Sequence, residues 1–141
     1  MEIFIVQNEQ QLQDAYTIRK KVFVEEQNVP LSIELDEHDE HATHFICYDS
    51  SNKPVGASRL RFIDNYGKLE RICVDKGLRG KSIGKKIIEI MEVEIIHQGY
   101  HEAVLNAQTH ATTIYEKLGY EVISDEFIDA GIPHVTMKKT L

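Results

Sequence analysis

The spacing of hydrophobic and polar residues follows two periods along the chain, which predicts a protein of mixed strands and helices. Short apolar runs rich in β-branched residues are typical of buried strands, whereas apolar residues three and four positions apart are typical of amphipathic helices. The turn residues Asn65, Tyr66 and Gly67 favour an antiparallel hairpin between the strands on either side. The pattern predicts strands at 2–6, 43–48, 54–63, 69–74, 103–106, 120–123 and 133–138, and helices at 8–27, 81–98 and 110–118.

The segment 69–86 joins a strand to a helix through a basic loop that contains glycine. The first turn of a helix has backbone N–H groups without internal partners, and the helix dipole makes this end positive. Gly80 lets a ligand approach the backbone closely. The basic side chains around it are Arg79, Lys81, Lys85 and Lys86. The sequence therefore predicts a site for a phosphate or pyrophosphate group at this helix start.

Two common phosphate-binding motifs do not fit this loop. A Walker A loop requires a glycine five residues before Gly80, and this chain has Asp75 there. The G-x-G-x-x-G dinucleotide motif fails because the glycines are Gly77, Gly80 and Gly84. On these residues alone, a solvated basic loop before a helix remains an alternative.

A third pattern does match. The run Arg79-Gly-Lys-Ser-Ile-Gly84 resembles the R/Q-x-x-G-x-G/A signature of the GNAT acetyltransferases, with Ser82 in the place of the usual middle glycine. The run Tyr115-Glu-Lys-Leu-Gly-Tyr120 is similar to the Y-E-K-L-G-F motif of the same superfamily. Four further segments resemble its ElaA-like branch; they are 22–27, 35–39, 105–108 and 131–134. One departure from this branch is Ala130, because Asp is common before the run 131–134.

The resemblance spans nearly the whole chain and implies both a fold and an activity. The implied fold belongs to the α+β class, with a central, mostly antiparallel sheet of about six to seven strands flanked by helices in one domain, 1–141. The predicted element order agrees with that of the superfamily if one short early helix is missing. The implied activity is acetyl-CoA-dependent N-acetyl transfer to a primary amine by direct attack in a ternary complex.

The resemblance also implies which residues carry this reaction. Tyr115 is expected to be the general acid that protonates the leaving thiolate, and Glu70 is the candidate base. The alternatives are a core tyrosine and a surface ion pair of Glu70 with Arg71 or a lysine. Asp36 and His134 are expected to line the acceptor pocket. Acetyl-CoA is expected to bind to Ile72, Cys73, Val74, Arg79, Gly80, Lys81, Ser82, Ile83, Gly84, Asn106 and Gln108.

An acidic segment at 34–44 carries His38, His41 and His44 among carboxylates. A metal site is one hypothesis for it. The histidine spacing is not that of a zinc-binding helix and no cysteine pair accompanies it, so a solvated acidic loop is favoured over a metal site. A third interpretation is that the acidic loop attracts a cationic substrate such as an amine.

Composition narrows the classes of function. The chain of 141 residues has a net charge of −7, so a broad nucleic-acid surface is not expected, and the basic loop indicates a small anionic ligand instead. No signal peptide or run of transmembrane length is evident, so we expect a cytoplasmic protein that does not act at a membrane. Cys47 and Cys73 lie in apolar runs and are expected to be buried free thiols.

Two alternatives to an enzyme remain open on the sequence. One is an acyl-CoA-binding module without turnover, and the other is a metal-binding protein that uses the segment 34–44. Both a monomer and a homodimer are compatible with the sequence, because an exposed last strand could pair with a second copy.

Overall fold

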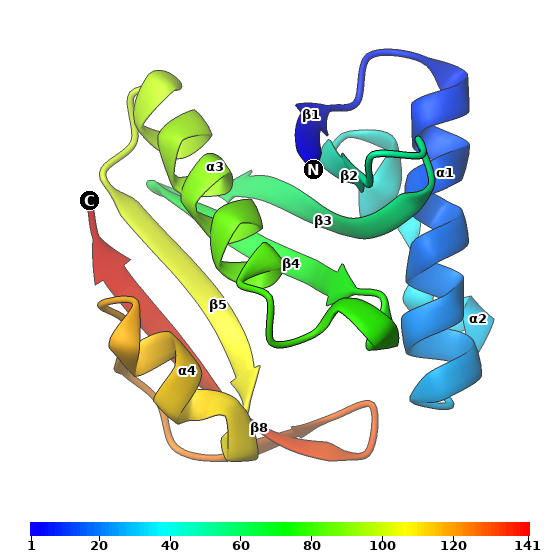
Figure 1. Cartoon of the computed structure of the whole chain (residues 1–141). Helices are drawn as coiled ribbons and strands as arrows, with labels where there is room; N and C mark the ends of the chain where they lie inside the picture. Colours follow the sequence, from blue (N-terminus) through cyan, green and yellow to red (C-terminus); the bar gives the residue numbers. More distant parts are fainter.

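The computed structural model describes residues 1–141 and contains one eight-stranded sheet in the order β1-β2-β3-β4-β5-β8-β6, with β7 paired to β8 (Figure 1). Every neighbouring pair is antiparallel except β4 and β5, which are parallel. The strands are β1 (Glu2–Ile5), β2 (Thr43–Tyr48), β3 (Pro54–Ile63), β4 (Tyr66–Val74), β5 (Glu102–Gln108), β6 (Glu121–Val122), β7 (Phe127–Asp129) and β8 (Ile132–Thr140). The predicted α+β class with a mostly antiparallel sheet is confirmed.

The helices are α1 (Glu9–Arg19), α2 (Leu31–Glu34), α3 (Ile83–His97) and α4 (Thr112–Lys117). The Asn8 side chain caps α1 by accepting a hydrogen bond of 2.9 Å from the backbone N–H of Gln11. From Lys20 to Glu26 the helix continues in the wider π form. The predicted helix 8–27 therefore has the right extent but changes its winding after Arg19. No helix is long and apolar enough to cross a membrane.

Helices α1 and α3 cover opposite faces of the sheet, and each has its own hydrophobic core (Figure 1). Successive residues of a strand point to opposite faces. In β2, Phe45 and Cys47 therefore belong to the core beneath α3, whereas Ile46 belongs to the core beneath α1. Helix α4 packs on the same side as α3, because Tyr115 contacts the α3 core.

A β-bulge interrupts this alternation in β4. Arg59 of β3 pairs with Glu70, but Ala57, two residues earlier, pairs with Cys73, so β4 has one extra residue at this point. Arg71 absorbs the extra residue with a φ of +55°, in the left-handed region. As a result Leu69 lies in the α3 core while Cys73 lies in the α1 core.

Strands β4 and β5 pair over only three residues and then separate. The pairs end at Leu69 with Leu105, beyond which β5 continues to pair with β8 as far as Gln108 and His134. Figure 1 shows the two strands diverging toward their carboxyl ends. The backbone of β4 after Leu69 therefore has no strand partner on the β5 side.

Several short elements were not predicted. These are α2, β7 and the 3₁₀ turns Glu37–Glu40, Lys76–Leu78 and Thr109–Ala111. With β7 the sheet has eight strands instead of six to seven. The helix α2 occupies the early position where the sequence pattern lacked one helix of the superfamily order.

The prediction of a solvated acidic loop at 34–44 is wrong for three of its residues. Glu34, Asp39 and His44 are 1%, 8% and 6% exposed. Arg19 of α1 lies 2.8 Å from a Glu34 carboxylate oxygen and 2.7 Å from one of Asp39, so both carboxylates are drawn into the interior by a buried cation. No three His, Cys, Asp or Glu side chains of the chain are grouped to hold a metal ion, which leaves the metal hypothesis without support.

Candidate active site

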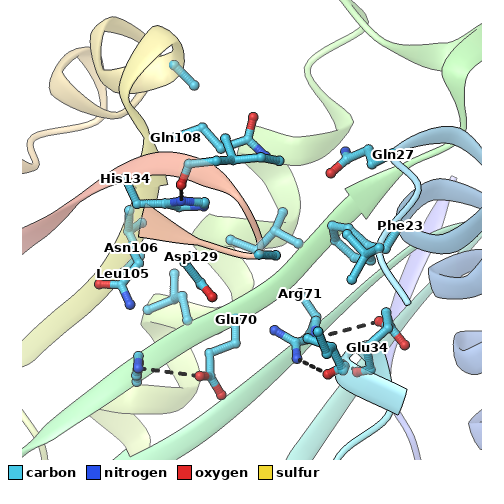
Figure 2. A pocket seen from close by; sticks show the side chains of 18 of the residues that line it. Phe23, Gln27, Glu34, Glu70, Arg71, Leu105, Asn106, Gln108, Asp129 and His134 are labelled. Carbon is cyan, nitrogen blue, oxygen red and sulfur yellow. Dashed lines mark hydrogen bonds and ion pairs between the residues drawn. The ribbon is translucent and has the colours of Figure 1, made fainter. Parts of the chain in front are cut away.

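A cavity of about 320 Å³ lies where β4 and β5 separate, and the residues of its wall come from both strands and from the segments that face them (Figure 2). Six predicted site residues line it: Glu70, Ile72, Asn106, Gln108, Tyr115 and His134. The structure thus brings together side chains from β4, β5, α4 and β8. Asp36, Cys73, Val74 and the loop 79–84 do not line this cavity.

Tyr115 of α4 contributes a phenol to the cavity wall. Its ring packs edge-on against Tyr120, with centroids 6.4 Å apart, and its hydroxyl makes no hydrogen bond within the chain. Burial raises the pKa of Tyr115, so the phenol is protonated at neutral pH. A partly buried phenol with a free hydroxyl is able to donate a proton to a group formed in the cavity.

Glu70 of β4 is held by cations. Arg61 Nε lies 2.6 Å and Arg59 Nη2 2.9 Å from its Oε1, and Arg61 Nη2 lies 3.0 Å from its Oε2. Burial by itself would raise the pKa of Glu70, but the hydrogen bonds from Arg61 and the charge of Arg59 outweigh it and lower this pKa to about 2. The carboxylate therefore stays ionised, and both of its oxygens already accept hydrogen bonds. This leaves it a weak proton acceptor.

Arg71 forms the floor of the cavity next to Glu70. Its guanidinium donates to the Glu34 and Ile33 carbonyl oxygens at 3.1 Å and to Asp36 at 3.2 Å, as the lower right of Figure 2 shows for part of this network. These bonds hold a residue with positive φ in place. Asp36, predicted to line the acceptor pocket, instead caps the 3₁₀ turn at Glu37–Glu40 and pairs with Arg59 at 2.6 Å.

The basic loop before α3 has the backbone of a glycine-rich turn. Gly80 has a φ of +86° and Ser82, the residue before the first turn of α3, a φ of +63°. A Cβ at Gly80 would meet no atom within 4 Å, and one at Gly84 would come no closer than 3.9 Å to Val74. Packing within the chain therefore does not require glycine at position 84, which indicates open space over the helix start.

The charges of this loop are only partly free. Arg79 pairs with Glu26 of the π-helix, at 2.9 Å between Nη2 and Oε1, and its Nε donates to the Val74 carbonyl at 3.1 Å. The Glu26 carboxylate thus neutralises the charge of the arginine that was expected to serve the phosphate site. Lys81 is exposed and makes no ion pair.

The end of β4 presents its backbone toward the separated side. The N–H of Asp75 donates to Val55 of β3 at 2.8 Å, whereas the Val74 carbonyl accepts from Arg79 and so points away from β3. Burial raises the pKa of Cys73 to about 12, so this residue is a thiol and not a thiolate. Its side chain lies in the α1 core, and Cys47 is likewise a buried free thiol.

The β5 side of the cavity is polar. Asn106 accepts a hydrogen bond of 2.8 Å from the Thr136 hydroxyl, and Gln108 Oε1 lies 2.6 Å from a ring nitrogen of His110. The side-chain N–H groups of both amides are left for other partners. Figure 2 shows Asn106, Gln108 and His134 along one wall, opposite Phe23 and Arg71.

Several residues of the cavity were not predicted. They are the apolar side chains of Phe23, Val29 and Ile33, and the charged side chains of Lys68, Arg71 and Asp129. Asp129 ends β7 just before the tight turn at Ala130 and Gly131, and the motif at 131–134 was the nearest signal of its place in the site. The sequence did not indicate that Phe23, within the segment 22–27, and Arg71 lie at the cavity, because they reach it through the π-helix and the bulge.

These features are those of a known family. Residues 6–141 match the sequence model of the acetyltransferase (GNAT) domain. The chain belongs to the GNAT acetyltransferase family. The uncharacterised N-acetyltransferase YjcF of Bacillus subtilis (strain 168) is 49% identical to it over 140 residues, which cover 99% of both chains. The resemblance to this family that the motifs indicated is thereby confirmed.

The resemblance to the ElaA-like branch of the GNAT family is supported as well. The protein ElaA of Escherichia coli (strain K12) is 26% identical over 133 residues, 92% of this chain and 87% of ElaA. Its crystal structure superimposes with a TM-score of 0.87 over 99% of both chains. A crystal structure of aminoglycoside 6′-N-acetyltransferase complexed with coenzyme A shares the fold, with a TM-score of 0.74 over 99% of this chain and 97% of that one at 16% identity. As a GNAT acetyltransferase, the protein is an acyltransferase, and its family implies an acyl-CoA as donor.

Proposed function

We propose that the protein is an acetyl-CoA-dependent N-acetyltransferase that acetylates a primary amine by direct attack within a ternary complex. The observation that carries this proposal is the cavity at the separation of β4 and β5, which Tyr115, with its free hydroxyl, lines together with the unpaired side of β4. An acyl-CoA needs a site for its phosphates, a backbone edge for its peptide-like arm and a proton donor for its thiolate.

The donor site is proposed to extend from the loop before α3 to the cavity. The phosphates would bind the N–H groups at the start of α3, between Gly80 and Gly84, with the charge of Lys81. The pantetheine arm would bond to the backbone of Ile72, Cys73 and Val74, whose β5 side is unpaired. The coenzyme A complex of a protein with the same fold supports this choice of ligand. Further contacts are proposed for Arg79, Ser82, Ile83, Asn106 and Gln108.

Tyr115 is proposed as the general acid. The neutral amine nitrogen attacks the thioester carbonyl carbon, a C–N bond forms and the C–S bond breaks. The departing sulfur takes the phenolic proton, and a proton from the nitrogen restores the phenol. The raised pKa of Tyr115 keeps that proton available at neutral pH. A backbone N–H of β4 beyond Leu69 would stabilise the tetrahedral oxyanion.

The amine is proposed to enter from the side of the cavity away from α3. There the wall combines apolar side chains with the carboxylates of Glu70 and Asp129. The charge of Glu70 is paired with Arg59, Arg61 and Lys68, whereas Asp129 makes no ion pair within the chain. The free carboxylate of Asp129 favours a cationic acceptor beside the apolar side chains of the wall.

Isothermal titration of acetyl-CoA tests the donor site. We expect binding by the wild type and at least tenfold weaker binding by Lys81→Glu, because the charge at the phosphate site is reversed. Lys53→Glu is the matched control, since it makes the same charge change in the exposed β2–β3 turn and should bind as the wild type does. Wild-type protein that does not bind acetyl-CoA would disprove the proposed donor, and equal loss in both variants would disprove the proposed phosphate site.

A further inference from the structure

The ring of His134 is fixed in one tautomer by its own strand. Its Nδ1 lies 2.7 Å from the carbonyl oxygen of Ile132. Because a carbonyl oxygen can only accept a hydrogen bond, Nδ1 must carry the proton, and in the neutral ring Nε2 is left with a free lone pair. The ring also stacks on Phe127 of β7, with centroids 6.0 Å apart and planes 24° apart, which restricts its rotation.

The residue that carries this Nε2 lone pair lines the cavity. His134 is half-buried, lies opposite Gln108 of β5 in the sheet register, and lines the same cavity as Tyr115 and Glu70. Figure 2 shows its ring projecting from β8 into the cavity. The bond to Ile132 is the only hydrogen bond of the ring within the chain. Nε2 is therefore free to bond to a molecule in the cavity.

The proposed reaction needs a proton acceptor at this place. An alkylamine is protonated at neutral pH, since the reference pKa of a lysine amine is about 10.4, and only the neutral amine is a nucleophile. Tyr115 is protonated and cannot accept. Glu70 is a weak acceptor, because Arg59 and Arg61 already bond to its oxygens.

We infer that His134 is the general base of this enzyme and takes a proton from the acceptor ammonium through Nε2. This inference rests on the proposed N-acetyl transfer. The first ammonium proton passes to Nε2, and the neutral nitrogen then attacks the thioester carbon. As the C–S bond breaks, the sulfur takes the proton of Tyr115; the second nitrogen proton returns to the phenolate, and the imidazolium releases its proton to water. All atoms and charges balance.

The charges around His134 suit this role. The ionisable groups that line the cavity with it are Glu34, Lys68, Glu70, Arg71, Tyr115 and Asp129. Glu34 is buried against Arg19, and Lys68 lies 3.5 Å from Glu70, so their charges are paired. Asp129, which has no ion pair, lines the same cavity, and Figure 2 shows its side chain between Asn106 and Glu70. An unpaired carboxylate in the cavity can hold the ammonium while it is deprotonated.

The variant His134→Asn tests the inference, because its amide N–H can still donate to the Ile132 carbonyl while Nε2 is removed. His101→Asn, on the exposed turn before β5, is the matched control. A panel of tyramine, cadaverine and an alanine dipeptide is assayed with acetyl-CoA by release of free thiol. The best substrate is then compared with hydroxylamine, a nucleophile that is neutral at pH 7.

For the protonated amine we expect wild-type kcat/KM to rise with pH, because the general base must be neutral to take the ammonium proton. In His134→Asn we expect this rise to be lost and kcat to fall at least ~100-fold at pH 7. Its turnover of hydroxylamine should fall at least tenfold less than its turnover of the amine, and its affinity for acetyl-CoA should stay within about threefold of the wild type. Equal loss with both nucleophiles, or an unchanged pH profile, would overturn the inference.

Nitrogen-15 NMR of the wild-type imidazole gives a test that needs no acceptor. We expect the neutral ring of His134 to carry its proton on Nδ1; a proton on Nε2 would overturn the inference even if no amine in the panel reacts. The two proposals fail separately. Absent acetyl-CoA binding refutes the proposed function, whereas turnover without a role for His134 refutes only the inference.

Discussion

At the scale of single residues, the site combines a side chain that has no hydrogen-bond partner in the chain with one that is fully paired. The hydroxyl of Tyr115 has no hydrogen-bond partner in the chain, although its partly buried ring packs against the core. Glu70 has three cationic neighbours within 3.5 Å. The first arrangement suits a group that must give up a proton during turnover, and the second suits a fixed charge.

Replacement of Tyr115 by phenylalanine should separate chemistry from binding. The variant keeps the ring and its packing but has no proton to donate. We expect kcat for the best amine of the panel to fall about 10²–10⁴-fold, the usual contribution of general acid catalysis, with an unchanged Kd for acetyl-CoA. Tyr100→Phe, outside the cavity, is the control. Full activity of Tyr115→Phe would show that another group protonates the thiolate.

Ser82 is a strained residue at the start of α3. Its φ of +63° costs an L-residue roughly 1–2 kcal/mol, more than the roughly 0.5–1 kcal/mol of backbone entropy that a glycine adds. We expect Ser82→Gly to raise the free energy of unfolding by up to about 1 kcal/mol in urea denaturation. Ser51→Gly, in a turn without positive φ, should not stabilise the protein. A destabilised Ser82→Gly variant would show that the serine side chain makes a compensating contact.

At the scale of elements, the junction of β4 with α3 has glycine where the fold does not demand it. Gly84 lies in the first turn of α3 and has room for a Cβ. We expect Gly84→Ala to keep or slightly raise stability, yet to weaken acetyl-CoA binding at least tenfold, because the methyl group would occupy the space above the helix start. Gly77→Ala, whose added Cβ would be 4.0 Å from Asp75, is the control. Equal affinities of the two variants would contradict a ligand at this turn.

The strands show how far the sequence pattern can predict this fold. The apolar runs at 43–48 and 54–63 match β2 and β3 at both ends, because alternating burial within a sheet is a local property. The bulge at Arg71 had no local signal, since positive φ usually favours glycine and here depends on contacts with Ile33, Glu34 and Asp36. The same is true of the separation of β4 from β5, which depends on pairing between distant strands.

The candidate site could likewise be predicted only in part from the sequence. Tyr115 and the loop at Gly80 were found through motifs, which are contiguous in sequence. The burial of Glu34 and Asp39 was not predicted, because it depends on Arg19, 15 and 20 residues away. A run of carboxylates favours a solvated loop unless a buried cation from another element reaches it.

At the scale of the whole molecule, one network of charges connects α1, α2, β3 and β4. Arg59 is central, since it pairs with Asp36, Asp39 and Glu70 and is 1% exposed. The other cations of the network are Arg19, Arg61, Lys68 and Arg71, and its remaining carboxylate is Glu34. The network lies beneath the cavity, so the position of Arg71 and the charge of Glu70 depend on it.

This network predicts a loss of stability in acid. Burial would raise the pKa values of Asp39 and Glu70, but bonds from Arg19 to Asp39 and from Arg61 to Glu70 lower both to about 2. A carboxyl whose pKa is lowered by folding stabilises the protein above its unfolded pKa, near 4, and loses that contribution as pH falls toward 2. A pKa difference of one unit between the folded and the unfolded chain corresponds to about 1.36 kcal/mol. We therefore expect the free energy of unfolding to fall by a few kcal/mol between about pH 4.5 and 2.

Urea denaturation at a series of pH values measures this dependence. Glu70→Gln should be less stable than the wild type at pH 6 and should show a shallower decline toward pH 2, because one of the titrating groups is gone. Glu121→Gln, on the exposed edge strand β6, should decline as the wild type does. Stability that stays level down to pH 2 would show that these ion pairs contribute nothing to folding.

The short pairing of β4 with β5 joins the two parts of the sheet through only three residue pairs, next to the place where an acyl-CoA is proposed to lie. A donor that binds the native backbone there, and does not bind the unfolded chain, stabilises the fold. At a donor concentration a hundredfold above Kd, the free energy of unfolding rises by about 2.7 kcal/mol. The resistance of the protein to proteolysis and its abundance in a cell would then rise and fall with the supply of its own acyl donor, quite apart from any effect of that supply on rate.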